Sequence, residues 1–244
     1  MTRLVLGIAT DHPDSSAALV GEDGILAAIA EERLNRKKHC AGFPALAIAE
    51  VLRIAGAELG DVTDIAVARD PMANLAPKAA FLARHPQRAG RLMLRRVAVH
   101  RQVRSTLDRI AGELGVDRAS IRAPLHQVEH HLAHVASSYY WAPTRRCVAL
   151  SSDGAGDFAT TMSAVCEGNR ISILGRTHWP HSLGVFYTAM SQFIGFDRFG
   201  EEFKMMGLAA YGRNRYGRVM RDLVRYRPGT GLRLDLRYFD HHVH

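Results

Sequence analysis

A pattern of three short apolar segments separated by two polar turns occurs twice in this chain, and it constrains the fold more than any other feature. The first copy covers residues 4–31 and the second covers residues 147–176. In each copy an aspartate-bearing turn follows the first segment and a glycine-containing turn follows the second. Short apolar runs that alternate with turn residues are typical of antiparallel strands joined by hairpins. We therefore predict two three-stranded meanders that form a structural repeat with little sequence identity.

The segments between and after the meanders mostly predict helices. Apolar residues recur at helical spacing over 45–59, 105–114, 130–140 and 185–194, and short strands are expected at 64–68 and 125–128. Residues 200–212 are expected to form a helix packed tightly against neighbouring backbone, whereas residues 214–244 are basic and weakly patterned. Two meanders, each followed by helices, are used by actin-like and sugar-kinase ATPases. The predicted fold is therefore α/β, with a first lobe over 1–143 that includes the histidine-containing helix and an incomplete second lobe over 144–244.

Two histidines on one predicted helix form the first candidate site. His130 and His134 are four residues apart, so on a helix both imidazoles project from the same face. Asp153 follows an apolar segment, residues 147–152, that reads as a buried strand. Two histidines and an aspartate with an open position suit Fe(II), Mn(II) or Zn(II). The alternative is that both histidines are ordinary polar residues on an exposed helix face, since the H-E-x-x-H pattern of zinc proteases is absent.

Polar residues in and after the first meander form the second candidate site. Asp11, His12 and Asp14 lie in its first turn, where they either cap the turn or let His12 or a carboxylate handle a proton. A cationic run follows the third segment: Arg33, Arg36, Lys37, Lys38 and His39. This run either binds an anion or forms a solvated charged face. Further along the chain, the methionines that follow Lys204 indicate that this lysine lies against packed structure.

The formal net charge of +8 raises the question of nucleic-acid binding. The positive charge is concentrated between Lys78 and Arg109, where arginines recur among leucines and valines. No aromatic residue lies between Arg84 and Arg104 to stack on bases. We expect an amphipathic basic helix, or helix pair, that faces solvent or phosphate or docks another domain. A nucleic-acid partner is not expected.

Cysteine usage and hydropathy exclude two further classes of protein. The three cysteines include no C-x-x-C pair, which argues against a zinc ribbon or a disulfide framework and fits a reducing cytoplasm. No apolar run approaches the roughly twenty residues needed to cross a bilayer. We therefore expect a cytoplasmic protein without a membrane partner.

Taken in order, the motifs of the chain resemble those of the ATP-dependent O-carbamoyltransferases, which include enzymes that carbamoylate antibiotics and nodulation factors. In the first half the matching stretches are Asp14–Val20, Glu31–Arg33 with Arg36, Lys38–His39 and Phe43–Pro44. In the second half they are Glu129–His134, Asp153–Asp157, Ser182–Gly184 and Gly200–Gly212. The resemblance covers nearly the whole chain.

The resemblance implies an actin-like, two-lobed domain, built from a duplicated ribonuclease-H-like unit and related to the tRNA threonylcarbamoyl transferases. In such enzymes a histidine pair and aspartates hold iron, which maps onto His130, His134 and Asp153. The remaining matched positions are expected to bind substrate: Arg33, Arg36, His39, His131, Gly154 and Lys204.

The resemblance also implies catalytic residues in the first meander. The catalytic histidine corresponds to His12, with Asp14 as a neighbouring carboxylate, and the anion-contacting lysine corresponds to Lys38. The family usually has the histidine directly before the aspartate, whereas Pro13 stands between them here.

The implied activity is transfer of a carbamoyl group from carbamoyl phosphate, through carbamoyl-adenylate formed with ATP, to a hydroxyl of a small-molecule acceptor such as a sugar or an antibiotic. Family members use a second, adenylate-forming domain, in cis or in trans, and a further metal-binding aspartate; these residues contain neither. The sequence therefore looks like a truncated portion of such an enzyme, the part that contains the acceptor site. We expect the enzyme to act in secondary metabolism and to use iron, with zinc or manganese as alternative metals. Two other functions stay open: a non-catalytic nucleotide- or metabolite-binding fragment, and a basic RNA-binding relative of the threonylcarbamoyl transferases.

Overall fold

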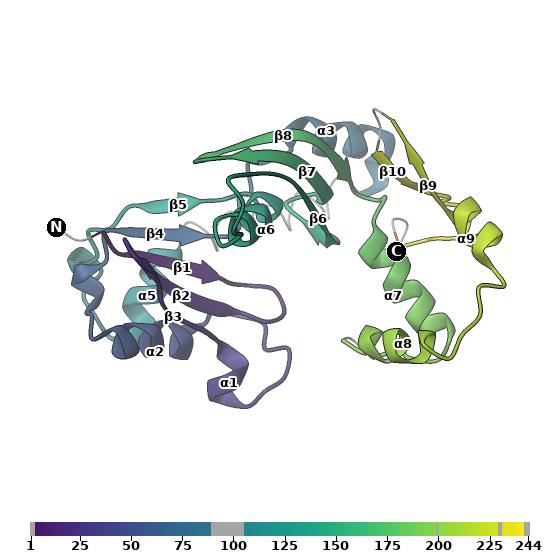
Figure 1. Cartoon of the computed structure of the whole chain (residues 1–244). Coiled ribbons are helices and arrows are strands. Elements are labelled where there is room, and N and C mark those ends of the chain that lie inside the picture. Colours follow the sequence, from purple (N-terminus) through teal and green to yellow (C-terminus); the bar gives the residue numbers. More distant parts are fainter. Residues whose placement is uncertain (1–2, 89–104, 199, 229–230, 242–244) are drawn as a thin grey trace. The chain divides into compact units, whose positions relative to one another are not determined.

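The computed structural model of the chain describes residues 3–88, 105–198, 200–228 and 231–241. The chain forms two compact units, which are described separately (Figure 1). Unit 1 consists of residues 1–73 and 80–129, and unit 2 consists of residues 74–79 and 130–244. Most of the basic segment predicted between Lys78 and Arg109 lies outside the described residues, which include only its two ends.

Unit 1 contains a five-stranded mixed sheet with the strand order β3-β2-β1-β4-β5. Its strands are β1 (Val5–Ala9), β2 (Ser16–Gly21), β3 (Gly24–Ala30), β4 (Asp64–Val67) and β5 (Leu125–Gln127). The first three form the predicted antiparallel meander, and β4 and β5 run parallel to β1, so β2 alone runs in the opposite direction. This order is that of a ribonuclease-H-like sheet, and the predicted α/β fold class is confirmed.

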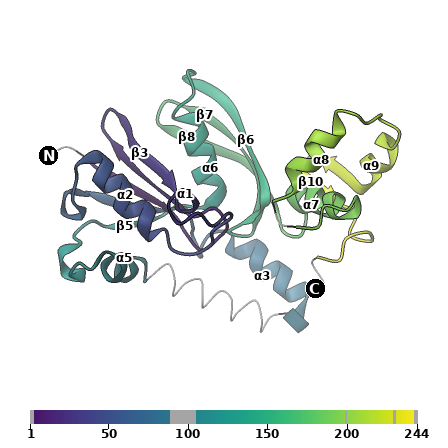
Figure 2. The ribbon, with the colours of Figure 1, turned by 90° about the horizontal axis from the view of Figure 1, so that it is seen from below.

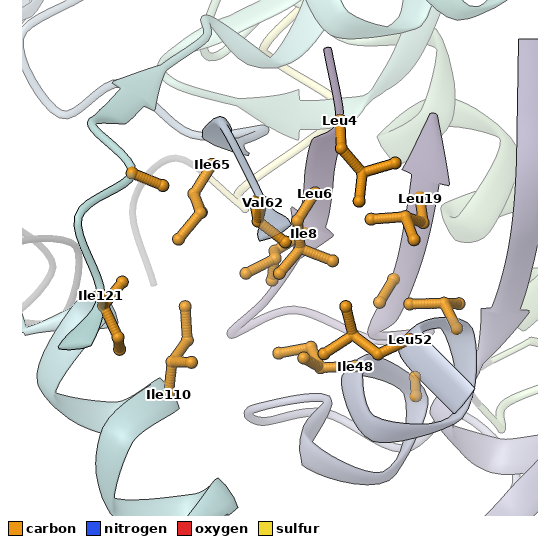
Figure 3. Packing of buried hydrophobic residues seen from close by; sticks show 14 of the residues in the cluster. Leu4, Leu6, Ile8, Leu19, Ile48, Leu52, Val62, Ile65, Ile110 and Ile121 are labelled. Carbon is orange, nitrogen blue, oxygen red and sulfur yellow. The ribbon is translucent and has the colours of Figure 1, made fainter. Parts of the chain in front are cut away.

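Helices cover one face of this sheet (Figure 2). These helices are α1 (Glu31–Asn35), α2 (Ala45–Ala55) and α5 (Thr106–Leu114). Helix α3 (Leu75–Arg84) includes residues of both units, and 3-10 turns lie at Leu59–Asp61, Pro86–Arg88 and Arg118–Ser120. Leu6 and Ile8 of β1 are 0% and 2% exposed and share one core cluster with Ile48 of α2 and Ile110 of α5 (Figure 3). Removing such side chains from water, at about 25 cal/mol per Å², is the main stabilisation of the unit.

Two details of unit 1 differ from the sequence prediction. Helix α2 ends at Ala55 because Gly56 adopts a left-handed conformation, with φ of 63°, and its N–H bonds to carbonyls of the last turn. The predicted end at Gly60 is therefore wrong. Residues 31–35, expected as a strand end and a polar segment, form α1, in which the buried Glu31 accepts hydrogen bonds from backbone N–H groups at the start of α2.

The longer segment of unit 2 begins with α6 (His130–Tyr139), which is followed by an antiparallel sheet of β6 (Arg146–Gly156), β7 (Ala159–Glu167) and β8 (Arg170–His178). This sheet is the second predicted meander. Helix α6 packs on β6 and β7 and shares a core cluster with them. The histidine helix, which we expected in the first lobe with a boundary after residue 143, therefore groups with the second meander.

The remaining elements of unit 2 are α7 (Leu183–Phe193), α8 (Glu202–Ala209), α9 (Gly217–Leu223) and a hairpin of β9 (Val224–Arg227) and β10 (Gly231–Leu234). The hairpin forms where the sequence showed only a weak pattern. The prediction of a tightly packed helix at 200–212 is wrong, because the contact of α8 with α7 buries none of its residues, and Phe203 and Met206 are 64% and 65% exposed. None of the described helices is long and apolar enough to cross a membrane.

The two meanders differ in what covers them. When Asp11 of the first meander is aligned with Asp153 of the second, Val148 and Leu150 take the positions of Leu6 and Ile8, the two buried residues of β1. Val148 and Leu150 are 72% and 73% exposed, whereas their counterparts lie under the helices of unit 1. Strand β6 is also at the edge of its sheet, whereas β1 is flanked by β2 and β4. Thus, within the described residues, β6 has an exposed apolar face and an unpaired edge, whereas the corresponding face and edge of β1 are covered.

Candidate metal centre

Three donor atoms from α6 and β6 converge in unit 2. Nε2 of His130 lies 2.8 Å from Oδ2 of Asp153 and 3.1 Å from Nε2 of His134. Nε2 of His134 lies 3.8 Å from the same carboxylate oxygen. The spacing of the two histidines brings both rings to one face of α6, as predicted, and Asp153 approaches them from the strand.

The separations of these atoms suit a single transition-metal ion. Metal–nitrogen and metal–oxygen bonds of about 2.0–2.2 Å place neighbouring ligands of one ion roughly 3–3.5 Å apart. The three observed separations bracket that range, and all three atoms lie within 4.8 Å of one another. Two imidazoles and one carboxylate with open positions suit Fe(II), and also Zn(II) or Mn(II). The residues present therefore fit the metal that the resemblance implies.

Asp153 is the charged member of the set. Its carboxylate accepts a hydrogen bond from His130, faces the imidazole of His134 at 3.8 Å, and accepts at Oδ1 a hydrogen bond of 2.6 Å from the backbone N–H of Gly154. These contacts hold the pKa of Asp153 well below its usual range, although burial opposes the shift. The carboxylate therefore stays ionised throughout the pH range in which histidines titrate.

The end of β6 holds His130 in place. A Cβ atom at Gly156 would overlap the His130 ring, so only glycine lets the ring lie against this strand. Oδ2 of Asp157 accepts a hydrogen bond of 3.0 Å from the backbone N–H of His130, the first residue of α6. A negative charge at the N-terminus of a helix also interacts favourably with the helix dipole. Nδ2 of Asn74 in turn donates to the carbonyl of Asp157 over 3.0 Å. The histidine helix and β6 are thus joined at the site itself.

Helix α7 begins beside Asp153. Ser182 caps this helix, because its Oγ accepts a hydrogen bond of 3.1 Å from the N–H of Val185. The same Oγ lies 3.0 Å and 2.7 Å from the carbonyl oxygens of Asp153 and Gly154. A Cβ atom at Gly184 would overlap the backbone of this strand. Ser182 and Gly184 therefore hold the start of α7 against the strand that carries Asp153.

The stretch from Asp153 to Asp157 differs from the prediction of a glycine-rich acidic turn. Strand β6 continues through Gly156 with an irregular pairing after Ser152, and the turn is formed by Asp157 and Phe158, whose φ angles are 49° and 76°. Gly154, expected to bind substrate, therefore lies within the strand. A Cβ atom there would meet nothing within 4 Å, so the position borders open space.

His131 has a different environment from its neighbours. Its ring is 0% exposed, and Nδ1 lies 2.8 Å from Oγ of Ser151. Together with Val135 and Tyr139 it forms the buried stripe of α6. A substrate does not reach a fully buried ring, so the structure gives His131 a packing role in place of the predicted contact with substrate.

A groove of about 510 Å³ lies beside the candidate metal ligands. Its walls come from α6, the loop that follows it and β6, and they include His134, Ser138, Tyr139, Val148, Leu150 and Asp153. Small-molecule sites in proteins have volumes of about 300–1,000 Å³. His134 and Asp153 are therefore part of a groove that can hold a small molecule.

The residues predicted on the first meander lie on two loops of unit 1 that are hydrogen-bonded to each other. Nδ1 of His12 lies 2.7 Å from the carbonyl of Pro13. Nδ1 of His39 lies 3.1 Å from Oδ1 of Asp14, and its backbone N–H donates to Glu32 over 3.0 Å. The structure thus brings Asp14 and His39 together.

The predicted cationic residues are exposed. Arg33 and Lys38 lie at the surface, and Arg36 ends α1 in a left-handed conformation with φ of 62°. Lys204 pairs with Glu201, and its side chain is 42% exposed. The expectation that Lys204 lies against packed structure is therefore wrong, because the helix that carries it is exposed.

Sequence reasoning missed the residues that hold these sites in position. Asp157 belongs to a matched stretch but received no role, and its acidic side chain just after a glycine was the available signal. Asn74 and Arg109 had no local signal, because their partners Asp157 and Asp11 lie 83 and 98 positions away in the sequence.

Comparison with known proteins gives a family for this arrangement. The family model described as carbamoyltransferase N-terminus matches residues 4–243. An uncharacterized protein, sll1178, of Synechocystis is 33% identical over 97% of this chain and 39% of its own length, and the nodulation protein NolNO of Sinorhizobium fredii is 31% identical over 82% of this chain and 28% of its own length. The chain therefore spans well under half the length of these relatives.

A solved structure, YeaZ from Pseudomonas aeruginosa, aligns with a TM-score of 0.37 and 16% identity over 71% of this chain and 64% of that one. The match of the family model is far more extensive, since it runs through both units and includes His130, His134, Asp153 and the first-turn residues. The chain belongs to the carbamoyltransferase N-terminus family.

Proposed function

We propose that this chain forms the acceptor-binding part of an O-carbamoyltransferase, which transfers a carbamoyl group to a hydroxyl of a small molecule such as a sugar or an antibiotic. The donor is carbamoyl-adenylate, which a second, adenylate-forming domain makes from carbamoyl phosphate and ATP. The observation that carries this proposal is the convergence of His130, His134 and Asp153 beside a groove of small-molecule size. Family membership supplies the class of reaction.

The ion in this proposal is iron, and zinc or manganese suits the same ligands. When bound, such an ion acts as a Lewis acid that polarises a carbonyl oxygen. The contribution of the protein is to keep the ligands rigid. Gly156 and Asp157 fix the ring and the helix start at His130, and Ser182 fixes the backbone at Asp153.

His12 is the proposed general base. A carbonyl only accepts hydrogen bonds, so the contact with Pro13 means that Nδ1 of the neutral ring carries the hydrogen and Nε2 bears the lone pair. Nε2 takes the hydroxyl proton while the acceptor oxygen forms a bond to the carbamoyl carbon. The bond from that carbon to the phosphate oxygen breaks, and AMP leaves with the electron pair.

The other polar residues of unit 1 handle the charge of the donor. Lys38, Arg33 and Arg36 are exposed cations on and after α1, and they would contact the phosphate, whose negative charge grows as the bond breaks. Asp14 and His39 form an ion pair or hydrogen bond of 3.1 Å that orients the loop carrying these cations.

The groove is the proposed site for the acceptor. Its walls combine apolar carbon with hydroxyls of Ser138, Ser151 and Ser152 and end at Asp153. The open space at Gly154 leaves room for a reacting group next to this ligand. Lys204 stays a candidate for binding a charged part of the substrate.

Further polypeptide of the longer relatives is the proposed partner of β6. Val148 and Leu150 border the groove and take the positions of buried core residues in the first meander, so the added polypeptide would close the groove on the β6 side. Strand β6 also carries a sheet edge where β1 pairs with the parallel strand β4. We expect V148E/L150E to leave the stability of the chain unchanged and to abolish its association with the carboxyl-terminal part of such a relative. The matched control is I25E/L26E in unit 1, where Ile25 and Leu26 are 48% and 47% exposed. Equal association of both variants would argue against this role for β6.

The function itself is tested by carbamoyl transfer. The chain is combined with a separately expressed adenylate-forming domain, labelled carbamoyl phosphate, ATP and a panel of sugars, and products are detected by mass spectrometry. Wild type is expected to yield a carbamoylated acceptor, and His130→Ala is expected to yield none. His126→Ala is the matched control, because His126 contacts Asp64 in unit 1 and is not a metal ligand. Absence of any product from the iron-loaded wild type, with carbamoyl-adenylate formed, would refute the proposal.

A further inference from the structure

Asp11, which joins the end of β1 to His12, is held through both its backbone and its carboxylate. Its N–H donates to the carbonyl of Gly42 over 3.0 Å, and its carbonyl accepts a hydrogen bond of 3.1 Å from Arg69. Its carboxylate accepts two hydrogen bonds from Arg109, of 2.8 Å and 3.1 Å. The φ of Asp11 is 60°, a conformation that residues other than glycine seldom adopt. These contacts stabilise this backbone conformation of Asp11.

Arg109 is itself fixed by the core of unit 1. It belongs to α5, whose neighbouring residue Ile110 is fully buried. Its guanidinium lies over the ring of Phe43, 4.5 Å from the centroid. The side chains of Arg109 and Asp11 are only 27% and 12% exposed. The planar fork of arginine matches both carboxylate oxygens at once, which the single ammonium of lysine cannot do.

The aspartates at corresponding positions of the two meanders, Asp11 and Asp153, have different cationic partners. Asp153 at the second meander faces two imidazoles, a set that fits a metal ion. Asp11 at the first meander faces the guanidinium of Arg109. Arg109 therefore supplies the cation that pairs with Asp11, and the carboxylate of Asp11 anchors the turn that contains His12.

We propose that Arg109 is a positioning residue, which acts through Asp11 to fix the turn that presents His12 and Asp14 to substrate. Asp11 and Asp14 both have left-handed φ angles, 60° and 65°, and they bracket His12 and Pro13. A change of backbone conformation at Asp11 therefore redirects the imidazole of His12. The inference rests on the proposed role of His12 as general base.

Histidine-ring NMR tests the positioning directly. In protein with labelled histidines, the ring signals of His12 are assigned by their loss in H12Q. We expect R109A to shift and broaden these signals, and we expect added guanidinium chloride at non-denaturing concentration to restore them. R109K keeps the charge without the fork and is expected to show a smaller shift. R53A is the matched control, because Arg53 forms a bidentate pair with Glu50 on the surface of α2 and its loss should leave His12 unchanged.

Kinetics separates positioning from simple stabilisation. In the transfer assay with the adenylate-forming domain, R109A is expected to lower kcat by about tenfold or more, with an unchanged KM for the acceptor and unchanged bound metal. A folded R109A, or R109K if R109A does not fold, whose His12 signals match wild type would overturn the inference. A wild-type protein without transfer activity would instead refute the proposed function, and the NMR result would still decide whether Arg109 positions His12.

Discussion

Replacing Gly156 by alanine should weaken metal binding without removing any ligand. The added Cβ would overlap the Cβ, Cγ and Cδ2 atoms of His130, so either the strand or the ring must move. Overpacking of this kind costs about 1–3 kcal/mol of folding free energy when the surroundings resist. If the ring gives way, one ligand is displaced, and changes next to a metal ligand lower metal affinity by about 10–100-fold.

Gly154→Ala is the matched control for this substitution. It adds the same methyl group to the same strand, but its Cβ would meet nothing within 4 Å. Metal affinity is measured by competition with a chelator and stability by denaturant unfolding of the metal-free proteins. We expect Gly154→Ala to match wild type and Gly156→Ala to lose at least about tenfold in affinity. Equal affinities in the two variants would refute the geometry that we describe around His130.

Three further predictions concern the same site. Asp157→Ala removes the acceptor for the first N–H of α6, so denaturant unfolding should show a stability loss of about 0.5–2 kcal/mol and the chelator assay a lower metal affinity. Asp157→Asn should keep most of the stability and of the metal affinity. An alanine variant identical to wild type in both would contradict this role of Asp157. Ser182→Ala should cost about 1 kcal/mol through the lost cap of α7, and unchanged unfolding would mean that the cap is dispensable. The apparent metal affinity should fall as the pH is lowered, because protons compete with the ion for the imidazoles while the lowered pKa of Asp153 keeps its carboxylate ionised. An affinity that does not change with pH would argue against histidine ligation.

Local periodicity was enough to predict much of the fold. The alternation in β1, where Leu6 and Ile8 are buried between half-buried neighbours, and the turn residues between strands specify a meander without any long-range information. The i, i+4 spacing of His130 and His134 likewise specifies one helix face. The same rule could have assigned His131 to the core, because it shares the four-residue spacing of Val135 and Tyr139.

The rest depends on contacts between distant parts of the chain. Gly56 and Gly60 are both glycines after an apolar helix, and only the packed structure shows that Gly56 takes the left-handed conformation. Apolar residues of α8 predicted burial, but burial requires a covering element, and the described part of the chain covers little of this helix. Contacts such as Arg109 with Asp11 carry no local periodicity, so they became visible only with the fold.

The central claim is that His130, His134 and Asp153 together hold one metal ion. X-ray absorption spectroscopy of the chain, reconstituted with Fe(II) under anaerobic conditions, tests it most directly. We predict one ion per chain with nitrogen and oxygen ligands at about 2.0–2.2 Å and the scattering of two imidazoles, lost in a folded H130A/H134A variant. A wild-type chain without a stoichiometric ion, or a double variant that keeps the same spectrum, would contradict the account.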